Sequence, residues 1–351
     1  MLCDAAGRHQ FTCVDVFHAM NGPDGTGVLG ELSVDGAHPS QAGHDLIAGL
    51  LADVDTTPLN DAPATSIAFH HGTEIALLDA AGTDLRVLPL GDGHPQHPNW
   101  SPDATHLTYE TEADSTIWVA DSDGSNARSV FKCTGTCEVA DDPSWSPDGS
   151  QLAFWWSDGP AQWIDVVDIS TGDVVHSVEG PELMGPVGPR WSPDGSKLLV
   201  AVGRFEPSGS DYTLVANTLG IIDLTATAPP IGSITSEDVI ASYPDWSPSG
   251  DRIVFQAGNA MPFDRSGEPP ELYTIRPDGT ELTQITHHAE GDPWIALPDW
   301  SALVGQPVLV TLIHDNGNLT LGRVDMATGS WSELVDSEGS PIAGAHPRSS
   351  R

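Results

Sequence analysis

Two residues near the start of the chain have a spacing that suits acid–base chemistry: Asp35 and His38, the latter followed by Pro39. A carboxylate that orients a histidine can serve acyl transfer, but a nucleophile and donors to the oxyanion must complete the site. The chain contains no Gly-x-Ser-x-Gly segment, the turn that presents the serine nucleophile in many hydrolases. We therefore expect no catalysis from this chain alone.

The segments around Asp35 and His38 predict a strand and a helix. Residues 11–17 are apolar and β-branched, and Ser40 is a suitable N-cap for a helix over residues 41–54. With these flanks, Asp35-x-x-His38-Pro39 resembles the last conserved block of SGNH (GDSL-type) hydrolases. The resemblance implies that Asp35 orients His38, and that His38 is the general base of a serine esterase.

The other blocks of the SGNH family do not precede this one. Neither the Gly-Asp-Ser block nor the Gly and Asn blocks of the oxyanion hole is found. Residues 1–54 are therefore expected to be a truncated C-terminal segment of such a domain, and the polar residues 55–63 a linker. If the missing part exists upstream, the parent protein would be a secreted SGNH-type esterase.

A second group of candidate residues would bind a ligand rather than react with it. Aromatic, methionine and arginine side chains are enriched at binding hot spots, and several stand in long loops. Basic residues are scarce, so Arg204 and Arg265 stand out; each could meet an acidic group on a ligand or pair with a neighbouring carboxylate. Several of the others could instead pack against their own loops. The candidate ligand-binding residues are Arg204, Phe205, Phe263, Arg265, His287, His288 and Trp294, with Trp156 and Trp163 at nearby strand ends.

The elements that must position these residues come from an internal repeat. Residues 142–149 read Asp-Pro-Ser-Trp-Ser-Pro-Asp-Gly, and related copies occupy residues 97–103, 188–195, 243–250 and, in reduced form, 297–301. The tryptophans of the five copies are separated by 45, 46, 55 and 54 residues. Periods of roughly 40–50 residues with strand-and-turn content predict a β-propeller with one blade per repeat.

The repeated motif predicts a β-hairpin. Ser-Pro-Asp-Gly provides Pro and Gly at turn positions, and a short apolar run follows each copy as a buried second strand. The proline two residues before each tryptophan cannot donate to a strand ladder, so we expect it at the start of the innermost strand. We expect the tryptophan itself to pack between blades.

Repeated Pro-x-Trp-Ser-Pro-Asp-Gly followed by a hydrophobic strand resembles the six-bladed TolB-type propeller, over residues 64–351. The resemblance implies an all-β domain that acts as a protein-binding module or as a gating domain of hydrolases such as prolyl oligopeptidases. The first blade, near residues 66–90, lacks an inner strand of its own. Residues 346–350 align with residues 97–101, so we expect the C-terminus to supply that strand and close the ring.

The loops of such a propeller differ between its two sides. In a four-stranded blade, the connections after the first and third strands lie on one side, here called the turn side, and those after the second and fourth strands on the other, the loop side. The repeated turns are short, whereas every long insertion belongs to the loop side. Long loops on one rim of a rigid scaffold are the usual place for recognition. The insertions are residues 132–142, 178–188, 203–211, 258–271 and 287–297.

Composition limits the partners of the chain. Its 13 basic and 50 acidic residues give a formal net charge of −37, which repels nucleic acid and anionic membranes. No run of 18 apolar residues occurs, so no membrane span is expected. The four cysteines form local pairs, Cys3 with Cys13 and Cys133 with Cys137, compatible with disulfides in an exported protein. We expect an extracellular or periplasmic location, with the signal peptide missing from this chain because residues 1–7 have no basic or apolar leader.

We expect neither a metal nor another cofactor. Cys133-x-x-x-Cys137 has no second pair of ligands nearby, and residues 121–124 lack the downstream Glu of a calcium loop. The chain is therefore expected to be a monomeric, non-catalytic module that binds a protein, peptide or glycan at its loop side. The alternatives are the C-terminal part of an SGNH esterase, or a propeller lyase or peptidase accessory, for which the sequence shows no acid–base constellation.

Overall fold

The computed structural model describes residues 66–350 except 80–83, 160, 182–183, 209–210, 227–229, 259–267, 302 and 304–306. All of the described residues belong to one compact unit, Pro63–Arg351. The predicted strand and helix of residues 1–54, together with Asp35 and His38, lie outside them. None of the described residues forms a helix with the length and apolar character that crossing a membrane requires.

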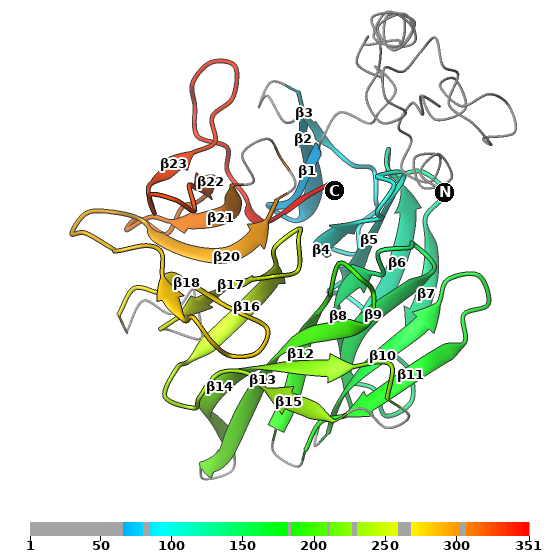
Figure 1. The fold of residues 1–351 in the computed structure, drawn as a ribbon. Coiled ribbons are helices and arrows are strands. Elements are labelled where there is room, and N and C mark those ends of the chain that lie inside the picture. Colours follow the sequence, from blue (N-terminus) through cyan, green and yellow to red (C-terminus); the bar gives the residue numbers. More distant parts are fainter. Residues whose placement is uncertain are drawn as a thin grey trace, which may run out of the picture. The chain divides into compact units, whose positions relative to one another are not determined.

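Six four-stranded antiparallel sheets form the blades of the propeller (Figure 1). The first blade runs outwards through β24 (Ala345–Ser349), β1 (Ser66–His71), β2 (Glu74–Asp79) and β3 (Leu85–Val87). The second runs through β4 (Pro95–Trp100), β5 (His106–Thr111), β6 (Thr116–Asp121) and β7 (Arg128–Lys132). The third runs through β8 (Val139–Trp145), β9 (Gln151–Ser157), β10 (Gln162–Asp168) and β11 (Val174–Glu179).

The other three blades follow the same order. The fourth consists of β12 (Met184–Trp191), β13 (Lys197–Ser208), β14 (Asp211–Asp223) and β15 (Ile231–Ser233). The fifth consists of β16 (Ala241–Trp246), β17 (Ile253–Ala257), β18 (Glu271–Ile275) and β19 (Thr283–Gln284). The sixth consists of β20 (Trp294–Trp300), β21 (Val308–Ile313), β22 (Leu319–Val324) and β23 (Trp331–Glu333). The all-β, six-bladed prediction is confirmed.

The ring closes through the C-terminus, as predicted. β24 pairs with β1, and Figure 1 shows the end of the chain running beside that strand. The Ser66 amide donates to Ser350 Oγ at 2.9 Å, and the Ser350 amide donates to the Ser66 carbonyl at 2.8 Å. Closure removes the two open sheet edges that an unclosed ring would expose.

The repeated tryptophans pack between blades, which confirms the prediction for them. All five are buried. Trp191 Nε1 donates to the carbonyl of Ser144 in the preceding blade at 3.1 Å, and Trp246 Nε1 donates to that of Arg190 at 3.2 Å. Ser349, which stands in place of a sixth tryptophan, makes two inter-blade bonds: its amide and its Oγ each donate to Asp299 Oδ2 at 3.1 Å.

The Ser-Pro-Asp-Gly segments form the predicted turns. In the copy at residues 146–149, Ser146 Oγ donates to Asp148 Oδ1 at 2.7 Å, and the amide of Ser150 donates to the same oxygen at 3.0 Å. Gly149 has a φ of 72°, a left-handed conformation that glycine adopts without a steric penalty. Asp103 and Asp194 accept the same two bonds in their copies, so in these three copies the aspartate ties both ends of the turn together.

The prolines lie at β-bulges, not at the strand starts where we expected them. Pro143, for example, is the fifth residue of β8, and pairing with β9 shifts between Asp141 and Ser144. A bulge leaves one residue out of the ladder, so a proline there costs no hydrogen bond. The residue before each proline is left-handed, with φ between 44° and 60°. We call these six positions the axial ring: His97, Asp142, Gly188, Tyr243, Leu297 and His346.

One expected loop is a hairpin of strands. Residues 203–211 were predicted as an insertion, but β13 and β14 extend through most of it and pair up to Ser208 and Asp211. The pairing shifts between Arg204 and Phe205, so a bulge interrupts this longest hairpin of the described residues. Phe205 and Leu214, which pair next to the bulge, lie on the part of this hairpin that faces the loop side.

Candidate functional site

A cavity of about 260 Å³, here called the axial cavity, opens on the loop side next to the propeller axis. Blades three, four and five provide most of its wall, and blade two contributes His97. Its apolar part includes Trp155, Val187, Phe205 and Leu214. The polar residues that line it are His97, Asp141, Asp142, Gln162, Arg190, Asn217, Ser242 and Tyr243.

Three of these polar side chains have a buried atom without a hydrogen-bond partner. The atoms are Gln162 Oε1, Asn217 Oδ1 and Ser242 Oγ. Asn217 is 7% exposed and Ser242 is 4% exposed, so neither has ready access to bulk water. Buried polar atoms are nearly always paired in native proteins, and exceptions call for an explanation. Their gathering in one cavity indicates a place where a ligand would complete the pairing.

A charged cluster lies at the inner end of the cavity. His97 Nδ1 is 2.7 Å from Glu110 Oε1 and 2.7 Å from Asp141 Oδ1. Arg190 Nη2 donates to Asp142 Oδ1 at 3.2 Å. The His97 ring also meets the His346 ring edge to face, with centroids 4.4 Å apart. Residues from the first four blades thus come together at the axis.

Burial and neighbouring charges separate the pKa values in this cluster. Burial by itself would lower the pKa of His97, but Asp141, Glu110 and Asp142 outweigh it and hold this pKa well above its usual value. Burial raises the pKa of Glu110 to about 8 against the attraction of His97. The pKa of His346 falls well below its usual value because the ring is buried beside His97. At neutral pH His97 is therefore the charged histidine and His346 the neutral one.

The cluster contains donor atoms that could hold a divalent metal ion. One ligand atom from each of His97, Glu110 and Asp141 lies within 4.8 Å of the others. One imidazole nitrogen and two carboxylate oxygens suit several divalent metals. At 2.7 Å, however, Nδ1 is within hydrogen-bonding distance of both carboxylates, so a metal would have to replace its proton. The same groups could exchange protons, but a nucleophile is not among them.

The predicted binding residues divide between the cavity and its surroundings. Phe205 lines the cavity. Trp156 and Trp163 are cross-strand partners that stack on each other with centroids 4.2 Å apart. Arg204 pairs with Glu206 Oε1 at 2.7 Å and with Glu237 Oε2 at 3.2 Å, so it takes the second of the two roles considered for it.

Among the described residues, three more of the predicted set do not line the axial cavity: His287, His288 and Trp294. His287 and His288 line a separate recess of about 20 Å³, where the His288 amide donates to Glu271 Oε1 at 2.5 Å. Trp294 is 5% exposed and packs in the hydrophobic core. Phe263 and Arg265 lie outside the described residues, as do Asp35 and His38.

Most of the residues at the axial cavity were not predicted from the sequence. Those in the axial ring carried a signal, because their residue type changes from copy to copy before a proline that does not change; the residue after that proline also varies. Gln162 and Asn217 carried no such signal, because each is a polar residue in a strand outside the repeated motif. Of the two cysteine pairs that are compatible with disulfides, Cys133 and Cys137 are bonded. Cys3 and Cys13 lie outside the described residues.

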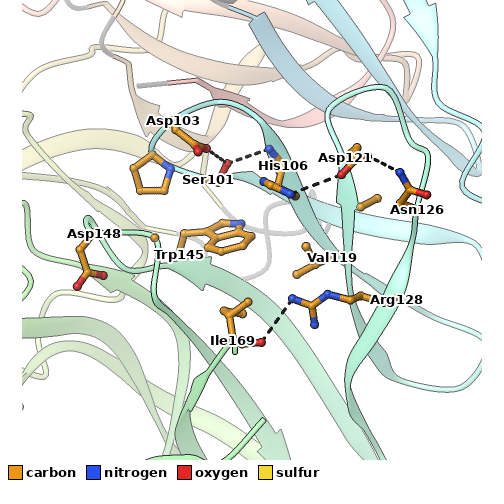
Figure 2. Close-up of a pocket in the computed structure, with 13 residues that line it drawn as sticks. Ser101, Asp103, His106, Val119, Asp121, Asn126, Arg128, Trp145, Asp148 and Ile169 are labelled. Atoms are coloured by element: carbon orange, nitrogen blue, oxygen red, sulfur yellow. Dashed lines mark hydrogen bonds and ion pairs between the residues drawn. The ribbon is translucent and has the colours of Figure 1, made fainter. Parts of the chain in front are cut away.

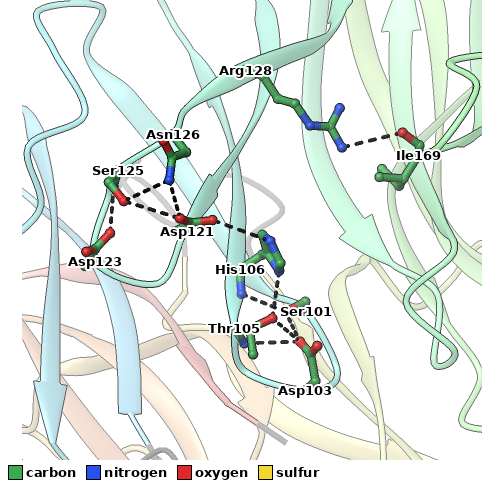
Figure 3. Close-up of polar contacts among 10 residues, drawn as sticks. All are labelled: Ser101, Asp103, Thr105, His106, Asp121, Asp123, Ser125, Asn126, Arg128 and Ile169. Atoms are coloured by element: carbon green, nitrogen blue, oxygen red, sulfur yellow. Dashed lines mark hydrogen bonds and ion pairs between the residues drawn. The ribbon is translucent and has the colours of Figure 1, made fainter.

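A larger hollow, about 450 Å³, lies on the turn side between the second and third blades (Figure 2). We call it the turn-side groove. The Trp145 indole lies in it, between His106 and Ile169. Its polar groups bond largely to one another (Figure 3): His106 Nε2 is 3.5 Å from Asp121 Oδ1, Asn126 Nδ2 donates to Asp121 Oδ2 at 2.7 Å, and Arg128 reaches the Ile169 carbonyl at 3.5 Å. One buried polar atom in this groove, Trp145 Nε1, has no partner, whereas three residues that line the axial cavity have such an atom, so we take the smaller axial cavity as the candidate site.

Comparisons with known proteins agree with this architecture. Residues 110–344 match the family described as TolB beta propeller domain. The uncharacterized peptidase YuxL of Bacillus subtilis is 26% identical over 212 residues, which are 51% of this chain and 31% of YuxL. The Tol-Pal system protein TolB of Albidiferax ferrireducens is 37% identical over 71 residues, 20% of this chain and 16% of that protein. The matches thus span less than a third of either relative.

Solved structures show the same fold. The crystal structure of TolB from Acinetobacter baumannii superposes with a TM-score of 0.58 at 17% identity, covering 91% of this chain and 74% of that one. A structure described as a putative TolB from Agrobacterium tumefaciens gives a TM-score of 0.57 at 18% identity, covering 81% of this chain and 98% of the other. At these identities the likeness establishes the fold alone.

Proposed function

Because the chain belongs to the family of TolB β-propeller domains, we propose that it is a non-catalytic binding module whose partner occupies the axial cavity. The partner is a protein, a peptide or a glycan, and the module acts as a monomer. Nucleic acid is an unsuitable partner because the chain carries a net charge of −37. The fold implies no reaction, so the proposal rests on the cavity.

The observation that carries the proposal is the set of unpaired acceptor atoms in that cavity. Gln162, Asn217 and Ser242 come from three different blades and line the same cavity, and each has one buried polar atom without a partner. Each such atom costs roughly 1–3 kcal/mol when it is left unsatisfied. A partner whose binding gave these atoms hydrogen bonds would remove this cost, and the recovered free energy would favour binding.

An extracytoplasmic location is part of the proposal. The bond between Cys133 and Cys137 supports it, because disulfides persist in oxidising compartments and are rare in the cytosol. An acidic surface with few lysines is compatible with a setting where salt screens like charges. The alternative of an SGNH-type esterase concerns residues 1–54 alone, and no feature of the described residues favours it.

Ligand-observed NMR with a mixed set of small fragments and short peptides tests the proposal. Val187→Phe places a larger side chain in the cavity wall, and Val174→Phe makes the same change on the outer strand β11, where Val174 is 51% exposed. We expect binders that lose their signal with Val187→Phe and keep it with Val174→Phe. If every binder responds alike to both variants, the axial cavity is not the binding site.

A further inference from the structure

The axial cavity lies where one position of the axial ring has no side chain. Five of the six ring residues carry a side chain, and the sixth is Gly188, in the fourth blade. The cavity is lined by Gly188 and by the ring residues of the two neighbouring blades, Asp142 and Tyr243. Among the described residues, a Cβ placed on Gly188 would meet only Asp142 Oδ2 within 4 Å, at 3.4 Å. The fourth blade thus leaves room for a side chain that the chain itself does not provide.

The corresponding residue of the sixth blade shows how such a position is filled. Leu297 is 2% exposed and packs in a hydrophobic cluster with Trp294, against which Tyr243 also packs. An apolar side chain at a ring position is therefore buried among its neighbours at the axis. At Gly188 the same position opens into the cavity instead.

The charged groups at the cavity balance one another. Arg190 Nη2 donates to Asp142 Oδ1 at 3.2 Å, and the charged His97 lies 2.7 Å from Asp141 Oδ1. Glu110 keeps its proton at neutral pH, because burial raises its pKa to about 8. A charged occupant would therefore lose its hydration without meeting a free counter-charge, and burying an unpaired charge is costly. The occupant that this cavity admits most readily is uncharged.

Aromatic rings from three strands line the cavity: Trp155 in β9, Phe205 in β13 and Tyr243 in β16. All three residues are only partly buried, so their rings are accessible to an occupant. Val187 and Leu214 add aliphatic surface. Aromatic pairs are stabilised beyond the burial of their apolar area. An apolar cavity of about 150 Å³ already admits benzene, so the volume of about 260 Å³ has room for a ring and its stem.

We propose that the axial cavity receives one uncharged aromatic side chain of a bound protein or peptide, in the place that Gly188 leaves open. This inference rests on the proposed function and names the group that the partner inserts. A glycan has no aromatic group, so the inference selects a polypeptide among the partners proposed above. The inserted ring packs against Trp155, Phe205 and Tyr243 and completes the axial ring.

Four probes of similar shape separate the ring from its charge: benzyl alcohol, cyclohexylmethanol, benzylammonium and benzoate. Saturation-transfer NMR titrations measure their binding to the full chain at neutral pH. We expect benzyl alcohol to bind at least about ten-fold more tightly than either charged probe. It should bind about two- to ten-fold more tightly than cyclohexylmethanol, which has no aromatic ring.

A blocked Gly-Phe-Gly peptide tests whether the ring belongs to a polypeptide. It should bind at least as tightly as benzyl alcohol, because the peptide backbone adds contacts around the mouth of the cavity. A peptide that binds more weakly than benzyl alcohol would identify a free aromatic molecule as the ligand. The assignment to a partner's side chain would then be wrong.

Gly188→Leu tests the place of the ring by filling it from within the chain. The sixth blade holds Leu297 at this position, so the repeat accepts leucine there. We expect the variant to fold, which circular dichroism checks, and to bind benzyl alcohol at least about ten-fold more weakly. Gly172→Leu is the matched control, because Gly172 is also left-handed, with a φ of 76°, and its Cβ would meet none of the described residues within 4 Å. It lies in a turn on the turn side and should leave binding unchanged.

Phe205→Leu is a second variant, which keeps the test decisive should Gly188→Leu not fold. It removes a ring from the wall and keeps an apolar side chain of similar size. Benzyl alcohol should bind about two- to ten-fold more weakly, whereas the affinity for cyclohexylmethanol should stay the same. If Phe205→Leu and a folded Gly188→Leu both bind benzyl alcohol as the native chain does, the ring binds elsewhere and the inference is wrong.

The outcomes distinguish this inference from the proposed function. If a charged probe or cyclohexylmethanol binds as tightly as benzyl alcohol, and Val187→Phe abolishes that binding, the cavity is a binding site that does not select an aromatic ring. The same conclusion follows if no aromatic probe binds while other fragments bind in a manner sensitive to Val187→Phe. If no fragment or peptide responds to Val187→Phe, the proposed function fails and this inference fails with it.

Discussion

Glu110→Gln should change how the stability of the propeller depends on pH. Glu110 is 4% exposed, and burial raises its pKa from 4.5 to about 8. Between those values the folded chain keeps a proton that the unfolded chain has lost, so the free energy of unfolding falls as pH rises through this window. Glutamine has the shape of the protonated acid and does not titrate. The variant should therefore match the native protein near pH 4, be the more stable of the two at pH 6, and exceed it by a larger margin at pH 9.

The size of the effect follows from proton linkage. One proton held by the folded state alone is worth about 1.4 kcal/mol per pH unit. From pH 6 to pH 9, with half-titration near pH 8, an isolated carboxyl would account for about 2.5 kcal/mol. His97 shares the proton, since its pKa is also raised beside Asp141 and Glu110. We therefore expect the stability difference between variant and native protein to change by about 1–2 kcal/mol over that range.

Urea denaturation at pH 6, 7, 8 and 9, at constant ionic strength, measures this difference. Glu112→Gln is the matched control: it makes the same substitution two residues further on, where the side chain is 65% exposed. Surface histidines titrate equally in all three proteins and cancel in the comparison. If Glu110→Gln and Glu112→Gln show the same pH dependence as the native chain, the buried acid does not hold the proton that its surroundings imply.

Three further predictions concern closure, the turns and chemistry. Deletion of residues 341–351 should lower the free energy of unfolding by several kcal/mol in urea titrations, because β1 loses its ladder and Phe69 its cover; an unchanged midpoint would contradict the closure. Asp148→Ala should cost about 1–2 kcal/mol in the same assay, because Ser146 Oγ and the Ser150 amide lose their acceptor, whereas a cost near zero would show that the turn holds without it. The chain should not turn over p-nitrophenyl acetate, and saturable hydrolysis that His38→Ala abolishes would contradict this.

The fold could be predicted because its determinants are local and repeated. Each copy of the motif contains its own turn residues and its own buried tryptophan, so the six blades follow from the period. Even the closing strand could be found, because His346, Pro347 and Ser350 keep the motif where Ser349 has replaced the tryptophan. The predicted place of the prolines, at the strand starts, was wrong because a proline indicates only that a hydrogen bond of the ladder is absent. It does not distinguish the first residue of a strand from a bulge.

The axial cavity could not be predicted because its chemistry is assembled across blades. Gln162, Asn217 and Ser242 lie in β10, β14 and β16, and the sequence around each describes only its own strand. Their meeting depends on how three neighbouring blades are arranged around the axis. Arg204 was a candidate that the structure does not place in the cavity. Its residue type suggested ligand binding, but its ion pairs with two glutamates form only in the folded chain.

The axial ring explains how one repeat can build both a uniform scaffold and a site of mixed chemistry. The proline and the turn hold each inner strand in the same bulged path, which forces the preceding residue into a left-handed conformation. The left-handed conformation costs a residue other than glycine roughly 1–3 kcal/mol of conformational free energy, and five of the six axial-ring residues are not glycine. This conformation brings rings of different blades together: the centroid of the His346 ring lies 4.4 Å from that of His97 and 6.4 Å from that of Tyr243. The bulge takes these side chains out of the sheet and directs them toward one another. Because the strand ladder does not use this position, its residue type is free to vary. Its variation among His, Asp, Gly, Tyr and Leu contributes to the charge and polarity of the axis.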